Sequence, residues 1–243
     1  MNWNGLELPN KNIYFEDDDV IIYCDDCRNV LSLLPDRSID LVLTDPPYGI
    51  GIHYSKAYDD KRDGYWEWFV PVVDAMVKIG KVTIFTHRNG ESQKHIHGWD
   101  WMGVWNKPGS FGARIGNSAI LPHWEPIYFY GIHSAGVYGE YCPDVLTFNP
   151  VKSSGSSLIG REKWQMAAFF DNHPCPKPIG LFQKLAQVFS PDGGIILDPF
   201  LGSGTTAYCA KKLGRKCIGI EIEEKYCEIA AKRLSQSVMK IGT

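Results

Sequence analysis

Residues 194–222 read GIILDPFLGSGTTAYCAKKLGRKCIGIEI, and this stretch decides the expected fold. The apolar run at 194–197 predicts a strand that ends at Asp198. After a glycine-rich turn, residues 205–213 predict a helix closed by Gly214. A second apolar run at 216–222 predicts another strand. Strand, helix and strand in this order are typical of a parallel α/β sheet.

The same alternation continues outward from this unit. Strands are predicted at 19–24, 39–44, 81–86, 99–105 and 126–130, and helices at 28–34, 65–79, 178–189 and 223–234. The unbroken apolar run IDLVLT at 39–44 suggests a strand covered on both faces. We therefore expect one α/β domain over residues 1–243, with a Rossmann-like, doubly wound, mainly parallel sheet. Residues 132–172 are rich in Gly, Ser and Pro and predict a loop-rich insertion within it.

Composition narrows the class of protein. The 243 residues are 44% hydrophobic and 22% charged, which suits an ordinary domain with a sizeable core. No apolar run approaches the roughly 18 residues of a membrane span. The N-terminus lacks a basic region followed by an apolar run, so we expect no secretory signal and a cytoplasmic protein.

Charge and cysteines give weaker indications. A net charge of −3 argues mildly against tight non-specific nucleic-acid binding, although it allows a local basic face. Lys152, Arg161 and Lys163 are candidates for that face, or for a solvated loop. Cys24 and Cys27 form a C-x-x-C without a second pair at zinc-ribbon distance. We interpret them as small buried residues and expect no metal site.

The glycine-rich turn is a candidate ligand loop. Gly202 and Gly204 permit a tight turn, which would direct backbone N–H groups and a helix N-terminus toward a carboxylate or phosphate. Glu221, at the end of the next strand, could accept hydrogen bonds from two ribose hydroxyls. The same residues also match the dinucleotide fingerprint G-x-G-x-x-A, so an NAD-type cofactor stays open at this point.

A second candidate site is Asp45-Pro46-Pro47-Tyr48, which follows the strand at 39–44 directly. The two prolines stiffen this turn at the carboxyl end of a strand, where α/β proteins bind ligands. An exocyclic base NH2 is a poor nucleophile because its lone pair is delocalised. Hydrogen bonds from it to the Asp45 carboxylate and the Pro46 carbonyl would free that lone pair, and Tyr48 could stack on a base rotated out of the duplex.

At these two turns the chain resembles the amino-methylating DNA methyltransferases, in which D-P-P-Y is catalytic and D-P-F-x-G-x-G-T lines the S-adenosylmethionine pocket. The order of the segments, with the catalytic turn before the cofactor loop, is similar to the β class of that family. The resemblance spans roughly residues 19–235 and implies S-adenosylmethionine as cofactor and DNA as partner. It also implies pairing as a homodimer.

The resemblance assigns further residues. It implies that Asp26 contacts the cofactor adenine, although Asp25 stands where the family has Gly. His173-Pro-Cys-Pro-Lys177-Pro178 resembles the segment that shapes the methionine end of the pocket. The implied cofactor-binding residues are Asp26, Lys177, Asp198, Phe200, Gly202, Ser203, Gly204, Thr205 and Glu221. Trp105–Gly109 and His123-Trp-Glu125 match the family's mid-chain pattern more loosely.

The resemblance implies a target amino group, with adenine N6 favoured over cytosine N4 because D-P-P-Y leans toward adenine in the family. Residues 132–172 occupy the place of a target-recognition element, and their small size indicates a short or relaxed DNA target. Trp164 and Arg161 are candidates for contact with DNA, and packing is the stronger interpretation for Trp164.

Four alternatives stay open. C5-cytosine chemistry needs a cysteine nucleophile, and Pro174-Cys175 supplies the usual dipeptide but lies far from DPPY in the sequence. An NAD-type oxidoreductase would leave DPPY unexplained. A non-catalytic DNA-binding module would have no need of that turn. A methyltransferase acting on RNA or on a protein glutamine is the fourth.

Overall fold

The computed structural model describes residues 2–50, 63–108, 122–133, 136, 138–150 and 177–236. Their main sheet contains β3 (Ile13–Glu16), β4 (Val20–Cys24), β5 (Ile39–Thr44), β6 (Gly80–Thr86), β7 (Trp101–Asn106), β8 (Trp124–Tyr130), β9 (Val145–Thr147), β10 (Ile195–Asp198) and β11 (Lys216–Glu221). The strand order is β3-β4-β11-β10-β5-β6-β8-β7-β9. From β4 to β6 every pair of neighbours is parallel, which confirms the mainly parallel sheet.

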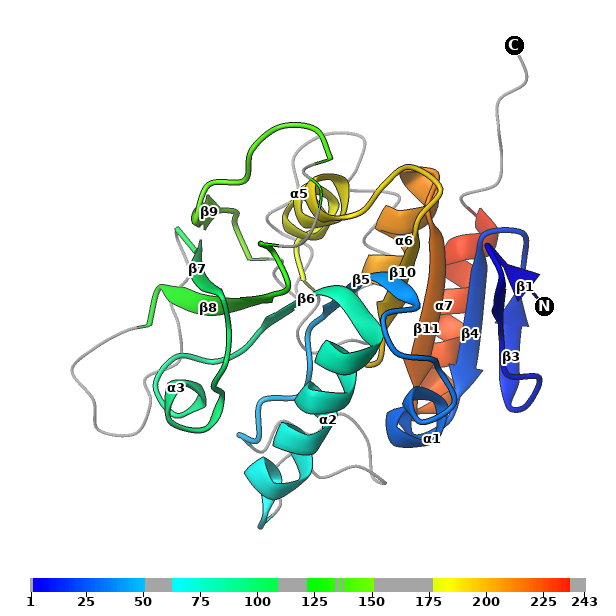
Figure 1. The fold of residues 1–243 in the computed structure, drawn as a ribbon, viewed down its shortest axis with the longest axis horizontal. Coiled ribbons are helices and arrows are strands. Elements are labelled where there is room, and N and C mark those ends of the chain that lie inside the picture. The colour runs from blue at the N-terminus through cyan, green and yellow to red at the C-terminus, as the bar shows by residue number, and fades with distance from the viewer. Residues whose placement is uncertain are drawn as a thin grey trace.

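Helices cover both faces of this sheet (Figure 1). They are α1 (Cys27–Leu31), α2 (Tyr65–Ile79), α3 (Ser92–His95), α5 (Ile179–Phe189), α6 (Thr205–Lys212) and α7 (Glu224–Gln236). On β4, Ile21 and Tyr23 belong to the core cluster of α1 and α2, while Val20 and Ile22 belong to that of α5, α6 and α7. This alternation confirms a strand buried on both sides and a doubly wound fold.

The chain reverses its winding direction between β5 and β10. From β5 it crosses through α2 to β6 on one side, and from β10 it crosses through α6 to β11 on the other. Strands β5 and β10 are parallel neighbours, with Leu41 opposite Ile196 and Val42 opposite Leu197. In open α/β sheets a crevice forms at the carboxyl ends of two such strands, so this is where a ligand is expected.

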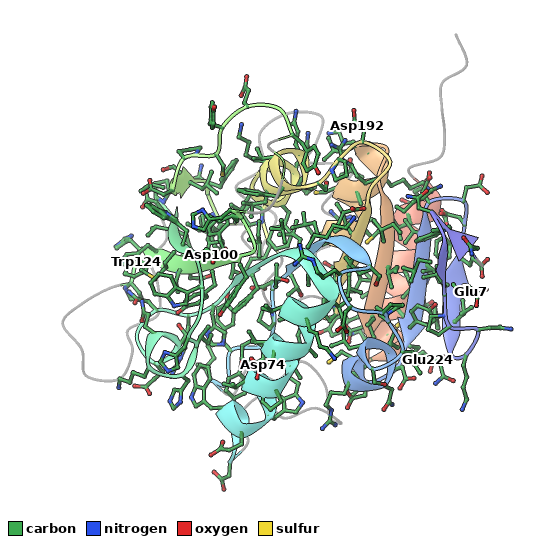
Figure 2. The ribbon with its side chains drawn as sticks, in the orientation of Figure 1. Glu7, Asp74, Asp100, Trp124, Asp192 and Glu224 are labelled. Carbon is green, nitrogen blue, oxygen red and sulfur yellow. The ribbon has the colours of Figure 1, made fainter. Side chains whose placement is uncertain are left out.

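Several short elements had not been predicted. They are β3, β9, α3 and a hairpin of β1 (Asn2–Trp3) and β2 (Leu6–Glu7), all four residues long or less. Periodicity cannot identify such short segments. The hairpin and the start of β8 lie toward opposite ends of the long axis, as Glu7 and Trp124 mark in Figure 2. The predicted helix at 28–34 is only the short α1. None of the described helices is long and apolar enough to cross a membrane.

We predict that Gly131→Ala destabilises the protein more than Gly98→Ala. Both glycines have left-handed backbone, with φ of 76° and 75°, so both changes carry a conformational cost of about 1 kcal/mol. A Cβ on Gly131 would also collide with the Lys81 backbone carbonyl, whereas one on Gly98 would meet nothing within 4 Å. The collision should add roughly 1–3 kcal/mol, measured by urea unfolding. Equal losses would contradict this packing.

Candidate active site

The catalytic turn and the glycine-rich loop line one pocket. Asp45 and Pro47 follow β5, and residues 198–203 follow β10 beside it. A buried hydrogen bond joins the two segments, in which the Thr44 hydroxyl donates to Asp198 Oδ1 at 2.5 Å. Asp198 also accepts the Phe200 backbone N–H at 3.0 Å, which shapes the start of the loop. Two turns that lie more than 150 residues apart in the sequence are thus fixed against each other.

The glycine-rich loop is held from α7. Gly204 has a φ of 80° and lies against α7, where a Cβ would come within 2.9 Å of the Ala230 Cβ. The buried Arg233 guanidinium donates to the Ser203 carbonyl at 3.1 Å and to the Thr205 hydroxyl at 3.2 Å. Contacts with α7 therefore fix the shape of the loop, and Gly202, Ser203 and Thr205 line the pocket.

Glu221 ends β11 at the pocket wall. Its two carboxylate oxygens accept the backbone N–H groups of Gly202 at 2.8 Å and Glu223 at 2.9 Å. Burial raises the pKa of Glu221 to about 7, against the effect of these two bonds. Burial likewise raises the pKa of Asp198 to about 6. Each oxygen of Glu221 can accept a further hydrogen bond, because a carboxylate oxygen has two lone pairs.

The pocket lining beside Glu221 is acidic, and the Asp25 backbone N–H donates to the Glu221 carbonyl at 3.0 Å. Asp26 caps α1 by accepting the Arg28 backbone N–H at 2.9 Å and also pairs with the Arg28 guanidinium at 2.6 Å. Asp25, the departure from the family pattern, accepts hydrogen bonds from the side chains of Asn12 and Asn29. Trp68 meets the predicted Phe200 edge to face, with ring centroids 5.9 Å apart. Trp68 was missed by the sequence analysis because its helical spacing reads as core.

Asp45 is surrounded by polar partners. Its Oδ1 accepts the Tyr48 hydroxyl at 2.8 Å and the Thr86 hydroxyl at 2.5 Å, and its Oδ2 lies 2.8 Å from Lys177 Nζ. Burial raises the pKa of Asp45, and the Lys177 charge opposes that rise. Lys177, predicted at the cofactor, lines the pocket and also contacts the Asp45 carboxylate.

Tyr48 is 9% exposed and stacks on His87 with ring centroids 4.8 Å apart. Tyr65 donates to the Pro47 carbonyl and lies 2.9 Å from His87 Nε2. Because the Tyr65 proton is already donated, His87 Nε2 must carry the proton of that second bond. Burial lowers the pKa of His87 to about 3, so the ring is neutral and supports the Tyr48 ring as an apolar surface.

The sequence analysis missed one further pair, Lys107 and Glu125, which lies behind Asp45. Glu125 Oε2 lies 2.8 Å from the Tyr48 hydroxyl, whose single proton it shares with Asp45, and Glu125 Oε1 pairs with Lys107 at 2.6 Å. Glu125 had been quoted only as part of a loose family match. The sequence feature that could have identified Glu125 is a charged residue in a strand, WEPIYFY, that is otherwise aromatic and apolar.

Some predicted features lie outside the described residues. They are Lys152, Arg161, Lys163, Trp164, residues 173–176 with Cys175, and most of the predicted insertion at 132–172. Cys24 and Cys27 are free thiols, half-buried and buried respectively.

Comparisons with known proteins agree with this geometry. A family model described as DNA methylase matches residues 39–232. The type II methyltransferase M.ScaI of Streptomyces caespitosus is 27% identical over 94% of this chain and 85% of its own length. M.HpaI of Haemophilus parainfluenzae is 28% identical over 88% of this chain and 73% of its own.

Two solved structures show the same fold. The cytosine-N4-specific PvuII DNA methyltransferase superimposes with a TM-score of 0.70 over 92% of this chain and 89% of that chain, at 16% identity. The complex of M1.HpyAVI with S-adenosylmethionine has a TM-score of 0.55, at 22% identity over 88% of this chain and 99% of that chain.

We predict that Asp198→Asn removes part of the pH dependence of stability. The native state resists ionisation of Asp198, so its contribution to stability is complete below its ordinary pKa of 3.8 and is lost as the pH rises to about 6. The Asn variant should therefore lose about 1–3 kcal/mol less than the parent between pH 4 and pH 6.5. Urea unfolding across that range measures the difference, with the exposed Asp36→Asn as control. Parallel curves for parent and variant would refute the assignment.

Proposed function

The chain belongs to the amino-methylating DNA methylase family, whose methyl donor is S-adenosylmethionine, and we propose that its target is the N6 amino group of adenine in DNA. One observation carries the site assignment: the DPPY turn and the glycine-rich loop line a single pocket, with Asp45 and Glu221 both in its wall. A base amine and a methyl donor could therefore meet there.

The charge of the pocket suits this donor. Its described lining includes one lysine, Lys177, and six carboxyl residues, Asp25, Asp26, Asp45, Asp198, Glu221 and Glu223. S-adenosylmethionine carries a sulfonium and an ammonium against one carboxylate, and when bound it supplies an electrophilic methyl group. The two negatively charged phosphates of NAD would be repelled by the same carboxylates. The lining thus favours a cationic ligand over a dinucleotide, although the loop fits the fingerprint of both.

We assign the cofactor contacts by chemistry. Glu221 accepts the ribose hydroxyls with its remaining lone pairs, and Asp26 accepts from the adenine amino group. Phe200 and Trp68 offer apolar surface between these polar groups. The backbone amides of Ser203 and Thr205, at the start of α6, receive the carboxylate. Those of Gly202 and Gly204 shape the loop, since they donate to Glu221 and to the Leu201 carbonyl. Asp198 shapes the loop through Thr44 and Phe200, and Lys177 closes the pocket beside Asp45.

The catalytic turn orients the base. In this proposal Asp45 Oδ2 and the Pro46 carbonyl each accept one N–H of the target amine, so its lone pair points into the pocket. Pro46 and Pro47 hold these acceptors rigid. Tyr48, supported by His87, borders the space for a base rotated out of the duplex. The proton that the amine loses can pass to Asp45. Orientation is the main contribution of these residues.

Adenine is favoured over cytosine because of the Asp in DPPY. Cytosine N4 is the second candidate, since the PvuII enzyme, which shares the fold, is cytosine-N4-specific. We assign target recognition to residues 132–172 and expect a homodimer, as in the family. Light scattering tests the dimer.

We predict that Asp45→Ala transfers methyl groups at least ~100-fold more slowly than the parent, yet binds S-adenosylmethionine, because it removes a positioned acceptor of the amine. Labelled methyl donor and genomic DNA measure the rate. Digestion to nucleosides identifies the base, with N6-methyladenine expected. Asp36→Ala, an exposed carboxyl far from the pocket, is the control. Near-parent turnover by Asp45→Ala would exclude this role, and N4-methylcytosine would select the second candidate.

We predict that Glu221→Gln weakens S-adenosylmethionine binding about tenfold, since it replaces one charge-assisted acceptor of the ribose by a neutral amide, at about 1.4 kcal/mol. Calorimetric titration measures the Kd. Glu224→Gln, the same change at the exposed first turn of α7, should bind as the parent does. An unchanged Kd in Glu221→Gln would place the ribose elsewhere.

A further inference from the structure

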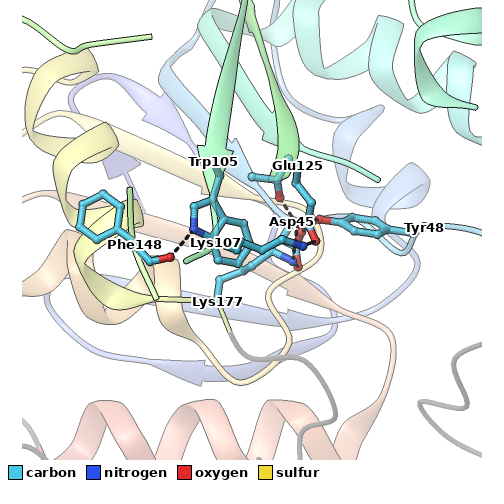
Figure 3. A network of polar contacts seen from close by, with 8 residues as sticks. Asp45, Tyr48, Trp105, Lys107, Glu125, Phe148 and Lys177 are labelled. Carbon is cyan, nitrogen blue, oxygen red and sulfur yellow. Dashed lines mark hydrogen bonds and ion pairs between the residues drawn. The ribbon is translucent and has the colours of Figure 1, made fainter. Parts of the chain in front are cut away.

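A largely buried charge cluster lies behind the DPPY turn and is formed by the buried Lys177 and the half-buried Asp45, Glu125 and Lys107 (Figure 3). Lys177 Nζ lies between two carboxylates, 2.8 Å from Asp45 Oδ2 and 3.7 Å from Glu125 Oε2. Its ammonium also lies 4.8 Å from the centre of the Tyr48 ring. No cofactor contact is needed to explain this arrangement.

The acceptor sites of Asp45 are almost all occupied. Oδ1 accepts the Thr86 hydroxyl at 2.5 Å and shares the single Tyr48 hydroxyl proton with Glu125 Oε2. Oδ2 has one printed neighbour, Lys177 Nζ at 2.8 Å. We therefore place the target amine at Oδ2, next to the ammonium group of Lys177.

That neighbour creates a conflict of charge. The amine nitrogen becomes positive as its bond to the methyl carbon forms, and a second cation beside it raises the energy of this state. Glu125 can relieve this conflict, because it is the second carboxylate beside the Lys177 ammonium group and is itself held by Lys107 at 2.6 Å. Lys177 could lean toward Glu125 without losing an anionic partner. The Tyr48 hydroxyl, 2.8 Å from both carboxylates, links the two positions.

We propose that Glu125 and Lys177 are positioning residues for methyl transfer: Lys177 holds Asp45 Oδ2 before the base arrives and shifts toward Glu125 when the amine takes its place. This inference rests on the proposed function. The reaction itself is unchanged, and no proton or electron is added. Glu125 sets how firmly Lys177 is bound to Asp45, and so how much of the Asp45 charge the amine receives.

The charges around Asp45 give the two residues opposite effects on it. Lys177 lowers its pKa and Glu125 raises it. The other ionisable groups that face this site are Tyr48, His87, Asp198 and Lys107. These four groups are unchanged in the single variants of Glu125 and Lys177, so a shift of the Asp45 pKa can be assigned to the substituted residue. Removing Lys177 should therefore raise the Asp45 pKa and removing Glu125 should lower it, and the slower plateau expected for Glu125→Gln tests the positioning role.

The test measures single-turnover methyl transfer from pH 5 to pH 9 at saturating donor and DNA. In Lys177→Met the acidic limb of the rate should move up by at least about one pH unit, since an opposite charge within 4 Å typically shifts a carboxyl by that much or more. In Glu125→Gln the limb should move down. On its plateau at high pH this variant should still be at least about tenfold slower, because Lys177 has lost its second anionic partner. The double variant should return the limb toward the parent position.

The chain offers a matched control in Lys94 and Glu91, an ion pair at 2.7 Å whose side chains are 66% and 44% exposed. Lys94→Met and Glu91→Gln should leave the rate profile unchanged. Thermal unfolding and the Kd of S-adenosylmethionine check that the Glu125 and Lys177 variants fold and bind the donor. If Lys177→Met does not fold, Glu125→Gln decides alone, by a limb that moves down and a slower plateau.

A second readout is independent of activity. Carbon-13 NMR of protein labelled at the Asp carboxyl carbon, with Asp45 assigned through Asp45→Asn, follows its titration without donor or DNA. The midpoint should rise in Lys177→Met and fall in Glu125→Gln. The inference would be overturned if the acidic limbs of the rate, or the Asp45 titration midpoints, moved in the same direction in the two variants or did not move. A plateau rate in Glu125→Gln equal to that of the parent would also overturn it. A parent that methylates no DNA but shows the opposite NMR shifts would instead count against the proposed function alone.

Discussion

The hydrogen bond from Thr44 to Asp198 joins the carboxyl ends of β5 and β10, the two strands at which the sheet reverses its winding direction. It is buried, and it fixes the DPPY turn against the glycine-rich loop. This alignment of β5 with β10 determines the pocket and its acidic lining. The approach of a base amine to the methyl donor depends on it as well. A slip of either strand by one residue would turn Asp198 or Thr44 away, because side chains alternate between faces. The site is therefore a property of the sheet as much as of its two motifs.

The parts of the structure that could be predicted from sequence are those encoded by neighbouring residues. The DPPY turn, the glycine-rich loop and the helix at 65–79 each carry a local pattern, and the doubly wound sheet follows from their alternation. Glu125 and Lys107 could not be found in this way. They reach Asp45 through the antiparallel register of β7 and β8, in which Trp105 lies opposite Glu125, and no local spacing encodes that pairing. His87 and Trp68 were hidden for a related reason, since their chemistry comes from what packs against them.

The loop motif indicates that a ribose-containing cofactor binds, and the charges of the pocket indicate which one. The loop sequence fits both a dinucleotide and S-adenosylmethionine, because both place a ribose near the end of the second strand. The carboxylates that surround the loop separate the two, as they suit a ligand with net positive charge. Those carboxylates come from several strand ends that only folding brings together. Likeness at 16–22% identity to the solved methyltransferases shows the fold, while the chemistry of this pocket rests on its own residues.

The anchoring of the glycine-rich loop by Arg233 and Ala230 has a consequence for biosynthesis. A ribosome makes residues 198–206 before residue 233. Until α7 docks, the loop lacks the guanidinium that organises the Ser203 carbonyl and the Thr205 hydroxyl. The nascent chain can collapse around its parallel strands, domain segments folding as they emerge, while its donor pocket stays incomplete. Competence to bind the methyl donor therefore requires the docking of α7 and cannot precede that step of maturation.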